Sequence, residues 1–237
     1  MTVDEPQPIL SHLQELRWRI VRSAVAVVVT SLVSLIFAGR IKDILERPYQ
    51  EICRDCAFQV LGATEQFSVL MKIAFFGGIV LASPYVLYQA WAFISPALTA
   101  RERRWAIPIV SACAVLFALG VAFGYWSLPR GLDFLLNIFE DVRTDLRLVD
   151  YFSFAIRFLL AFGLSFLYPV FLFAAAAAGL ITSAQLAHGR RWAVLIIVTA
   201  AAIITPTGDA LTLTLLSVPL YLFYEITYWL VRLVLHK

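Results

Sequence analysis

The chain has 237 residues, of which 61% are hydrophobic and 15% are charged, with a net charge of +3 and a mean hydropathy of +0.83. Soluble domains are about half apolar and a quarter charged, so this composition excludes a soluble globular enzyme and indicates that lipid surrounds most of the chain. The apolar runs are long and unbroken, which favours membrane-spanning helices over a β-barrel with alternating polarity.

A spanning helix needs about 20 predominantly apolar residues. Six windows are predicted as spans, namely 22–38, 73–94, 105–128, 158–181, 192–204 and 210–231. The fifth is short for a span, and the sixth carries Glu225 near its end. The acidic amino terminus lacks a small-residue cleavage site after the first apolar stretch, so we expect that stretch to be retained. Kinks are expected at Pro84, Pro108, Pro169 and Pro219, which predicts a bent all-α bundle.

Two loops on one side of this bundle, 39–72 and 129–157, are long enough to carry helices of their own. In the first loop Ile41 and Leu45 are spaced as on one face of a helix, before Pro48. We expect the two loops to form an outer cap. The opposite side of the bundle has short arginine-dense segments, containing Arg17, Arg19, Arg22, Arg101, Arg103, Arg104, Arg190 and Arg191. In the loops, acidic residues outnumber basic ones, so the positive-inside rule places both termini in the cytoplasm.

The three cysteines are too few for a disulfide framework. Cys53 and Cys56 have the spacing of a redox or metal-binding pair, but a zinc site needs four ligands and the histidines lie in other segments. The simpler interpretation is two loop thiols, joined if the loop is extracytoplasmic. Cys113, inside an apolar run, is predicted to be a packing residue. No metal or cofactor is expected.

No enzymatic constellation is found in the predicted spans. The segment 163–166, Gly-Leu-Ser-Phe, is only loosely like a serine nucleophile elbow, and no span contains a histidine that could act as its base. We interpret this segment, and the glycines of 120–124, as small-residue stripes for helix packing. A secondary transporter of small molecules or ions is the alternative function. The chain lacks internal repeats, and Glu225 is its one carboxylate within a predicted span.

Two carboxylates lie among arginines at the predicted cytoplasmic boundary. Glu15 lies in the segment 12–17, His-Leu-Gln-Glu-Leu-Arg, and Glu102 lies in the segment 99–104, Thr-Ala-Arg-Glu-Arg-Arg. The residues alone leave open that both simply pair with their neighbours, because exposed ion pairs contribute about 0–1 kcal/mol.

Several segments, taken together, resemble the TatC family, the receptor subunit of the twin-arginine protein translocase. They are His-Leu-Gln-Glu-Leu-Arg at 12–17, Ala-Ser-Pro at 82–84, Tyr-Gln-Ala-Trp-Ala-Phe-Ile-Ser-Pro-Ala-Leu at 88–98, Glu-Arg-Arg at 102–104, Phe-Gly-Leu-Ser-Phe at 162–166 and Thr-Pro-Thr-Gly-Asp at 205–209. They occur in the family's order and extend over essentially the whole chain.

The resemblance implies a bent, glove-like bundle in the bacterial inner membrane that binds twin-arginine signal peptides. With single-span TatA-like and TatB-like partners, it would export folded proteins using the proton-motive force. The resemblance assigns the signal's two arginines to Glu15 and Glu102, because a guanidinium offers a planar fork to a carboxylate. Arg17 and Arg104 would keep these glutamates ionised and also compete for them. Phe93 would line the approach for the signal's apolar stretch.

The resemblance also assigns three residues on the outer side. Pro48 matches a family proline that closes the first outer helix, Tyr125 matches an aromatic near the outer end of the third span, and Asp209 matches an aspartate linked to function beyond signal binding. One departure concerns Leu167 and Leu213, where family members commonly carry polar side chains. Since intramembrane polar groups are usually functional, we expect partner docking here to use less polar contact.

Overall fold

The computed structural model describes residues 9–53, 58–94, 106–137, 146–177, 179, 181–205 and 209–235. Within these ranges the regular secondary structure is helical, apart from an isolated bridge between Gln59 and Arg147. This confirms the all-α prediction. The helices are α1 (Ile9–Ile36), α2 (Ala38–Ile52), α3 (Glu65–Ile94), α4 (Ala106–Leu136), α5 (Leu148–Ser165), α6 (Tyr168–Ala177), α7 (Ser183–His188), α8 (Arg190–Ile204) and α9 (Ala210–Leu230), followed by a π-helical turn (Val231–Leu235).

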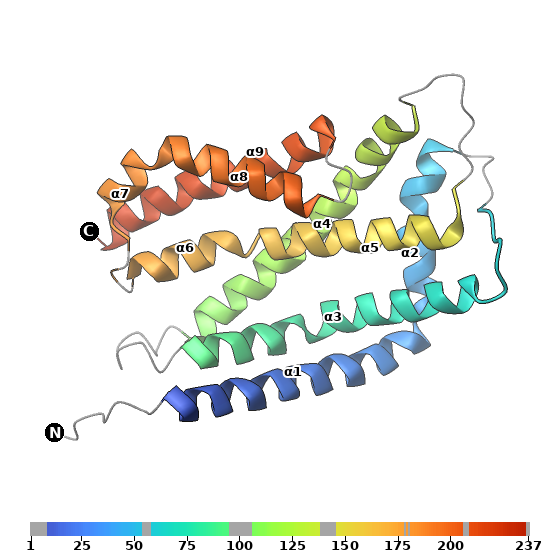
Figure 1. The fold of residues 1–237 in the computed structure, drawn as a ribbon, viewed down its shortest axis with the longest axis horizontal. Coiled ribbons are helices and arrows are strands. Elements are labelled where there is room, and N and C mark those ends of the chain that lie inside the picture. The colour runs from blue at the N-terminus through green and yellow to red at the C-terminus, as the bar shows by residue number, and fades with distance from the viewer. Residues whose placement is uncertain are drawn as a thin grey trace.

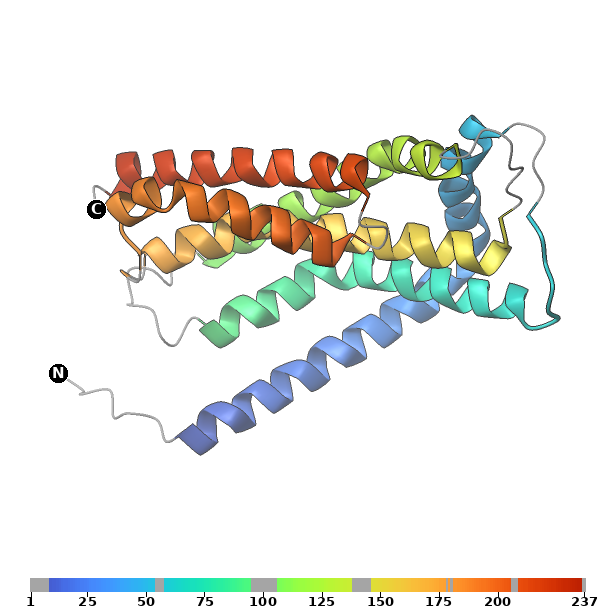
Figure 2. The same cartoon turned by 45° about the horizontal axis from the view of Figure 1, so that its top comes forward.

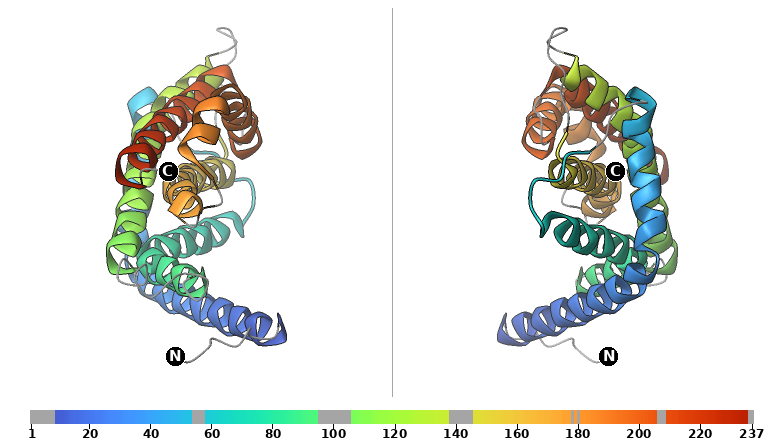
Figure 3. Two further views of the ribbon diagram at one scale, coloured as in Figure 1. Left: turned by 90° about the vertical axis from the view of Figure 1, so that its left-hand side faces the viewer. Right: turned by 90° about the vertical axis from the view of Figure 1, so that its right-hand side faces the viewer.

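The helices form a bent bundle rather than a closed cylinder. α1, α3 and the α5–α6 pair run side by side, α4 crosses them obliquely, and α2 lies across one end (Figure 1). A rotated view shows that α1 begins, and α9 ends, at the same end of the bundle (Figure 2). Viewed along the helices, α1 and the α8–α9 pair lie at opposite edges of the molecule (Figure 3).

Five segments of the described chain are long and apolar enough to cross a membrane: Leu13–Ile36, Glu65–Phe93, Ile107–Leu136, Leu148–Ala177 and Ala210–Leu233. The predicted span 192–204 lies in α8, which has 15 residues. At about 1.5 Å per residue this helix is about 22 Å long, less than the roughly 30 Å of a bilayer core. Its short length is why five segments, rather than six, meet the length requirement.

The prolines in the apolar segments differ in their effect on the helices. The helical path is interrupted at Phe166 and Leu167, just before Pro169, and this break separates α5 from α6. α3 and α9 continue through Pro84 and Pro219. Pro108 falls in the first turn of α4, where a missing N–H costs no hydrogen bond. A complete break is therefore found at only one of the expected positions.

The two predicted outer loops pack against each other. The first contains the separate helix α2, as expected, whereas the described part of 129–157 contains only the end of α4 and the start of α5. Gln59 joins the two: its N–H donates to the Leu146 carbonyl at 3.1 Å, and its carbonyl accepts from the Leu148 N–H at 3.0 Å. An ion pair between Glu65 and Arg147 lies beside this bridge and raises the pKa of the guanidinium.

Aromatic rings fill the space beneath this cap. Tyr49 and Phe58 stack with centroids 4.6 Å apart, and Tyr151 lies 5.3 Å from Tyr49 and 5.2 Å from Phe58. The Tyr151 hydroxyl donates to the Leu45 carbonyl of α2 at 2.5 Å. The cap is thus held by aromatic packing as well as by polar contacts.

Glycines allow the helices to approach closely at two interfaces. A Cβ on Gly120 of α4 would lie 2.7 Å from the Phe162 carbonyl oxygen, and one on Gly163 of α5 would lie 2.8 Å from the Phe117 ring. At the α1–α3 interface, a Cβ on Gly78 would lie 2.7 Å from the backbone of Ser31. The small-residue stripes predicted for α4 and α5 are therefore packing surfaces, and α1 depends on a similar one.

Candidate functional site

A polar cluster connects the first part of α1 to the last part of α3. Arg19 donates to Glu15 Oε1 from both Nε, at 3.0 Å, and Nη2, at 2.5 Å. Its Nη1 reaches the Gln89 side-chain oxygen at 3.3 Å, and the Gln89 amide nitrogen donates to the Tyr85 hydroxyl at 2.7 Å. Gln89 is buried, whereas the Glu15 and Arg19 side chains are 29% and 21% exposed. The predicted receptor carboxylate therefore already has an arginine partner.

Phe93 lies on the same face of α3 as this cluster, because it follows Gln89 by one helical turn, and its side chain is half-buried. Arg17 is exposed and lies two positions after Glu15, on a different side of α1. The other predicted binding residues, Glu102 and Arg104, lie outside the described residues.

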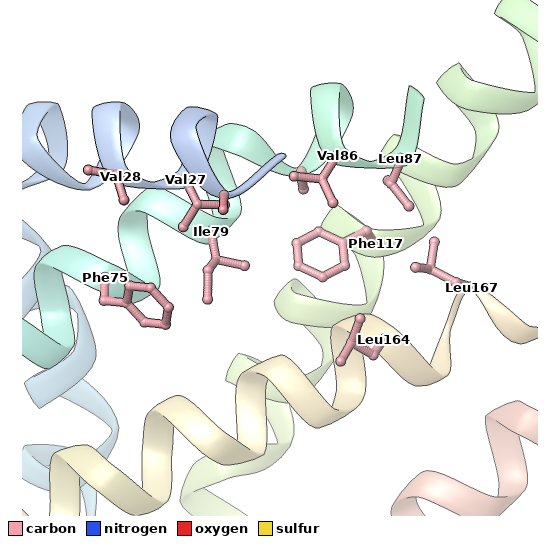
Figure 4. A pocket seen from close by; sticks show the side chains of 11 residues that line it. Val27, Val28, Phe75, Ile79, Val86, Leu87, Phe117, Leu164 and Leu167 are labelled. Carbon is pink, nitrogen blue, oxygen red and sulfur yellow. The ribbon is translucent and has the colours of Figure 1, made fainter. Parts of the chain in front are cut away.

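An apolar groove of about 460 Å³ lies further along α1 and α3; its first lining residue on α1 is Ala24, five residues after Arg19. Figure 4 shows Val27 and Val28 of α1, Ile79 and Leu87 of α3, Phe117 of α4, and Leu164 and Leu167 around a common space. On α3 the wall of the groove extends from Leu87 back to Phe75, about 18 Å along the helix axis. Leu167, one of the two positions at which the sequence departs from the resemblance, forms part of the wall of this groove.

Pro48 and Tyr125 meet at one backbone carbonyl. The expectation that Pro48 closes the first outer helix is wrong, because α2 continues to Ile52. Proline has no N–H for the carbonyl four residues earlier, that of Ile44. The Tyr125 hydroxyl donates to this carbonyl at 2.8 Å and replaces the missing hydrogen bond. The two residues therefore connect α2 to α4.

Asp209 is the N-cap of α9. Its carboxylate accepts hydrogen bonds from the backbone N–H groups of Leu211 at 3.1 Å and Thr212 at 2.8 Å, and from the Thr212 hydroxyl at 2.5 Å. Thr212 is fully buried and packs where a Cβ on Gly131 of α4 would lie, 2.7 Å from its methyl group. Asp209 thus stabilises the end of α9 against α4.

Glu225 has its partners on α8 and α9. Arg190 donates to its carboxylate at 2.9 Å, and the Tyr221 hydroxyl donates at 3.1 Å. The Arg190 guanidinium also lies 4.7 Å from the centroid of the Tyr228 ring. This carboxylate, which marked the transporter alternative, therefore belongs to a contact between two helices at the end where α9 ends.

Arg19 and Gln89 were not among the residues predicted from the sequence. The spacing of Glu15 and Arg19, four residues apart on a helix, favours an ion pair and was a usable signal. Gln89 lies 70 residues from Arg19 in the chain, so only the packing of α1 on α3 reveals its contact.

The apolar segments and the polar cluster at one end of the bundle define an integral membrane protein. The sequence profile of the family described as "Sec-independent protein translocase protein (TatC)" matches residues 11–219. The chain belongs to the TatC family.

Known relatives and structures agree with this assignment. The TatC protein of Aquifex aeolicus is 37% identical over 97% of both chains, and the chloroplastic TATC of Arabidopsis thaliana is 36% identical over 97% of this chain and 68% of its own length. A crystal structure titled "Twin Arginine Translocase Receptor- TatC in DDM" is 37% identical, covers 94% of this chain and 100% of its own, and has a TM-score of 0.82. The protein is therefore a core component of the Sec-independent translocase and not an enzyme, and the comparisons give no support to the transporter alternative.

Proposed function

We propose that this chain is the receptor that binds twin-arginine signal peptides, with Glu15 taking one arginine of the pair. The observation that carries this proposal is the position of the carboxylate. Glu15 already accepts a guanidinium, that of Arg19, and the apolar groove begins further along the same helix, at Ala24. A ligand with arginines followed by an apolar stretch would meet the carboxylate and the groove in that order. Glu102 is proposed for the second arginine from its sequence position.

We also propose six spans, with α8 as the short fifth, and both termini in the cytoplasm of a bacterial cell with this protein in its inner membrane. Two observations support this orientation. α1 begins and α9 ends at the same end of the bundle (Figure 2), and Cys53, which directly follows α2 at the opposite end, is disulfide-bonded. Disulfides persist on the oxidising, extracytoplasmic side of a membrane.

The proposed partners are single-span TatA-like and TatB-like subunits, with transport driven by the proton-motive force. Leu167 lies in an apolar wall, so a partner helix that packs there would meet methyl groups rather than a carboxylate. Packing of this kind depends on shape and on van der Waals contact.

The binding proposal is tested by measuring the affinity of a fluorescent twin-arginine signal peptide for the translocase in native membrane vesicles. Charge-assisted hydrogen bonds contribute about 1.5–3 kcal/mol, so Glu15→Gln should weaken binding by about 10-fold or more. Asp43→Asn is the matched control, since it removes one exposed carboxylate at the other end of the bundle. Equal affinities of Glu15→Gln and the control would contradict the proposed site.

A further inference from the structure

Arg19 occupies the position at Glu15 that the proposed function gives to a signal arginine. Two of its nitrogens bond Glu15, and a third bonds Gln89 across the α1–α3 interface. Both hydrogen bonds to Glu15 end on the same oxygen, Oε1, whereas the stronger fork-to-fork arrangement uses two oxygens of a carboxylate. The internal pair therefore satisfies the carboxylate with less than the best geometry.

The pair is also accessible from the surface. A pocket of about 340 Å³ is lined by Glu15, Trp18, Arg19 and Arg22, so the carboxylate and its partner face one open space. Partly exposed pairs with the i, i+4 spacing contribute little stability, about 0.2–1 kcal/mol. An arginine from another chain that reaches this pocket can therefore displace Arg19 at small cost.

Gln89 offers Arg19 a hydrogen-bond acceptor that stays in contact when Arg19 leaves Glu15. Its amide is buried, and its orientation is set by the hydrogen bond to Tyr85, so its oxygen is directed at the Arg19 guanidinium. A guanidinium has five N–H donors, so Arg19 can release Glu15 and keep the contact with α3.

We propose that Arg19 is an internal competitor for the receptor carboxylate, displaced when a signal arginine binds. This inference rests on the proposed function and adds to it a minimum affinity that a signal peptide must exceed. Every ligand must replace the Arg19 contact, so the apparent affinity of all ligands is lowered by the same factor. A signal with paired guanidinium groups still binds at this lowered affinity. A signal with lysines, which lack the fork, binds more weakly, so at the working peptide concentration it no longer occupies the site.

The experiment measures the affinity of paired-arginine and paired-lysine signal peptides for the translocase in native vesicles, carrying either the wild-type chain or Arg19→Gln. An internal pair of about 0.2–1 kcal/mol lowers apparent affinity by about 1.4- to fivefold. Arg19→Gln should therefore tighten binding of both peptides by this same factor. Arg22→Gln is the matched control, because it removes one positive charge from the same pocket and reports the general electrostatic effect.

The decisive comparison is made in the Glu15→Gln background, where Arg19→Gln should give no more tightening than Arg22→Gln. When Glu15 is present, either of two results overturns the inference: Arg19→Gln weakens binding, or it tightens binding only as much as Arg22→Gln does.

Membrane levels and the thermal midpoint of each variant identify a folding defect. Arg19→Lys provides a second variant, which is expected to tighten binding less than Arg19→Gln. If Glu15→Gln itself leaves affinity unchanged, the proposed function fails; if it weakens binding but Arg19→Gln does not tighten it, the competitor alone fails.

Discussion

Replacing Gly78 by alanine tests how α1 is held in the bundle. α1 is the most exposed of the apolar segments and packs chiefly on α3. At the contact, the Thr30 hydroxyl donates to the Gly78 carbonyl at 2.8 Å, and a Cβ on Gly78 would lie 2.7 Å from the backbone of Ser31. Since the obstacle is backbone, a side-chain rotation cannot relieve the clash, and α1 must move away from α3.

The size of the effect follows from that distance. Ordinary carbon contacts begin at about 3.5 Å, so the helices must separate locally by about 0.8 Å. A gap of 0.5–1 Å forfeits about a quarter to a half of the dispersion energy of the atoms concerned. Overpacking of this kind costs about 1–3 kcal/mol, and the better helix propensity of alanine returns up to about 1 kcal/mol. We therefore expect a net loss of about 1–2 kcal/mol at the α1–α3 interface.

The assay is thermal denaturation of the purified protein in detergent, together with disulfide crosslinking between cysteines placed on α1 and α3. Gly78→Ala should lower the midpoint by several degrees, since about 1 kcal/mol corresponds to about 2–4 °C for a chain of this size. Gly39→Ala in α2 is the matched control, because a Cβ at Gly39 has no neighbour within 4 Å, and it should be neutral or slightly stabilising. An unchanged midpoint and unchanged crosslinking in Gly78→Ala would refute this account of the interface.

Two further predictions concern other interfaces. Tyr125→Phe leaves the Ile44 carbonyl without its donor and should destabilise the cap by about 0.5–1.5 kcal/mol, measured by thermal denaturation. Pro48→Ala supplies an N–H to that carbonyl, so it should reduce the cost of Tyr125→Phe; equal costs in both backgrounds would argue against the shared role. Glu225→Gln should loosen α8 from α9 and lower the stability by about 0.2–1 kcal/mol, because the pair with Arg190 is partly exposed; thermal denaturation measures this. If the pair with Arg190 is responsible, adding Arg190→Gln should cost less than it does alone, and strict additivity would contradict the coupling.

Composition and apolar periodicity predict most of this fold, because lipid permits few backbone arrangements. They locate the apolar helices and the helix before Pro48. They do not predict that α2 continues through Pro48, since the compensating donor, Tyr125, lies 81 residues away in the chain. They also do not predict which proline breaks its helix, because a break at Pro169 and continuity at Pro84 depend on how neighbouring helices pack.

For the site, the sequence motif identifies Glu15 but does not show which arginine pairs with its carboxylate. Arg17 and Arg104 are the competitors that the motifs suggest, yet the arginine that reaches Glu15 among the described residues is Arg19. Helix geometry gives the reason: Arg17 is two positions away and faces elsewhere, while Arg19 is four positions away and lies directly above. A count of nearby charges ignores this directional effect.

Gln89 links the Arg19–Glu15 pair to the packing of α1 against α3. An i, i+4 pair on an isolated helix binds and releases without consequence for the rest of the protein, because both partners move together. Arg19 also bonds Gln89, so its position depends on how α1 sits against α3, and that packing is set about 16 Å away along α3 at Gly78. The two features are therefore coupled: a change that shifts α1 at Gly78 should alter how firmly Arg19 holds Glu15. Gly78→Ala should therefore change signal affinity through Arg19 as well as through the apolar groove, whose wall includes Val28 and Ile79, and the change should be smaller once Arg19 is replaced by glutamine.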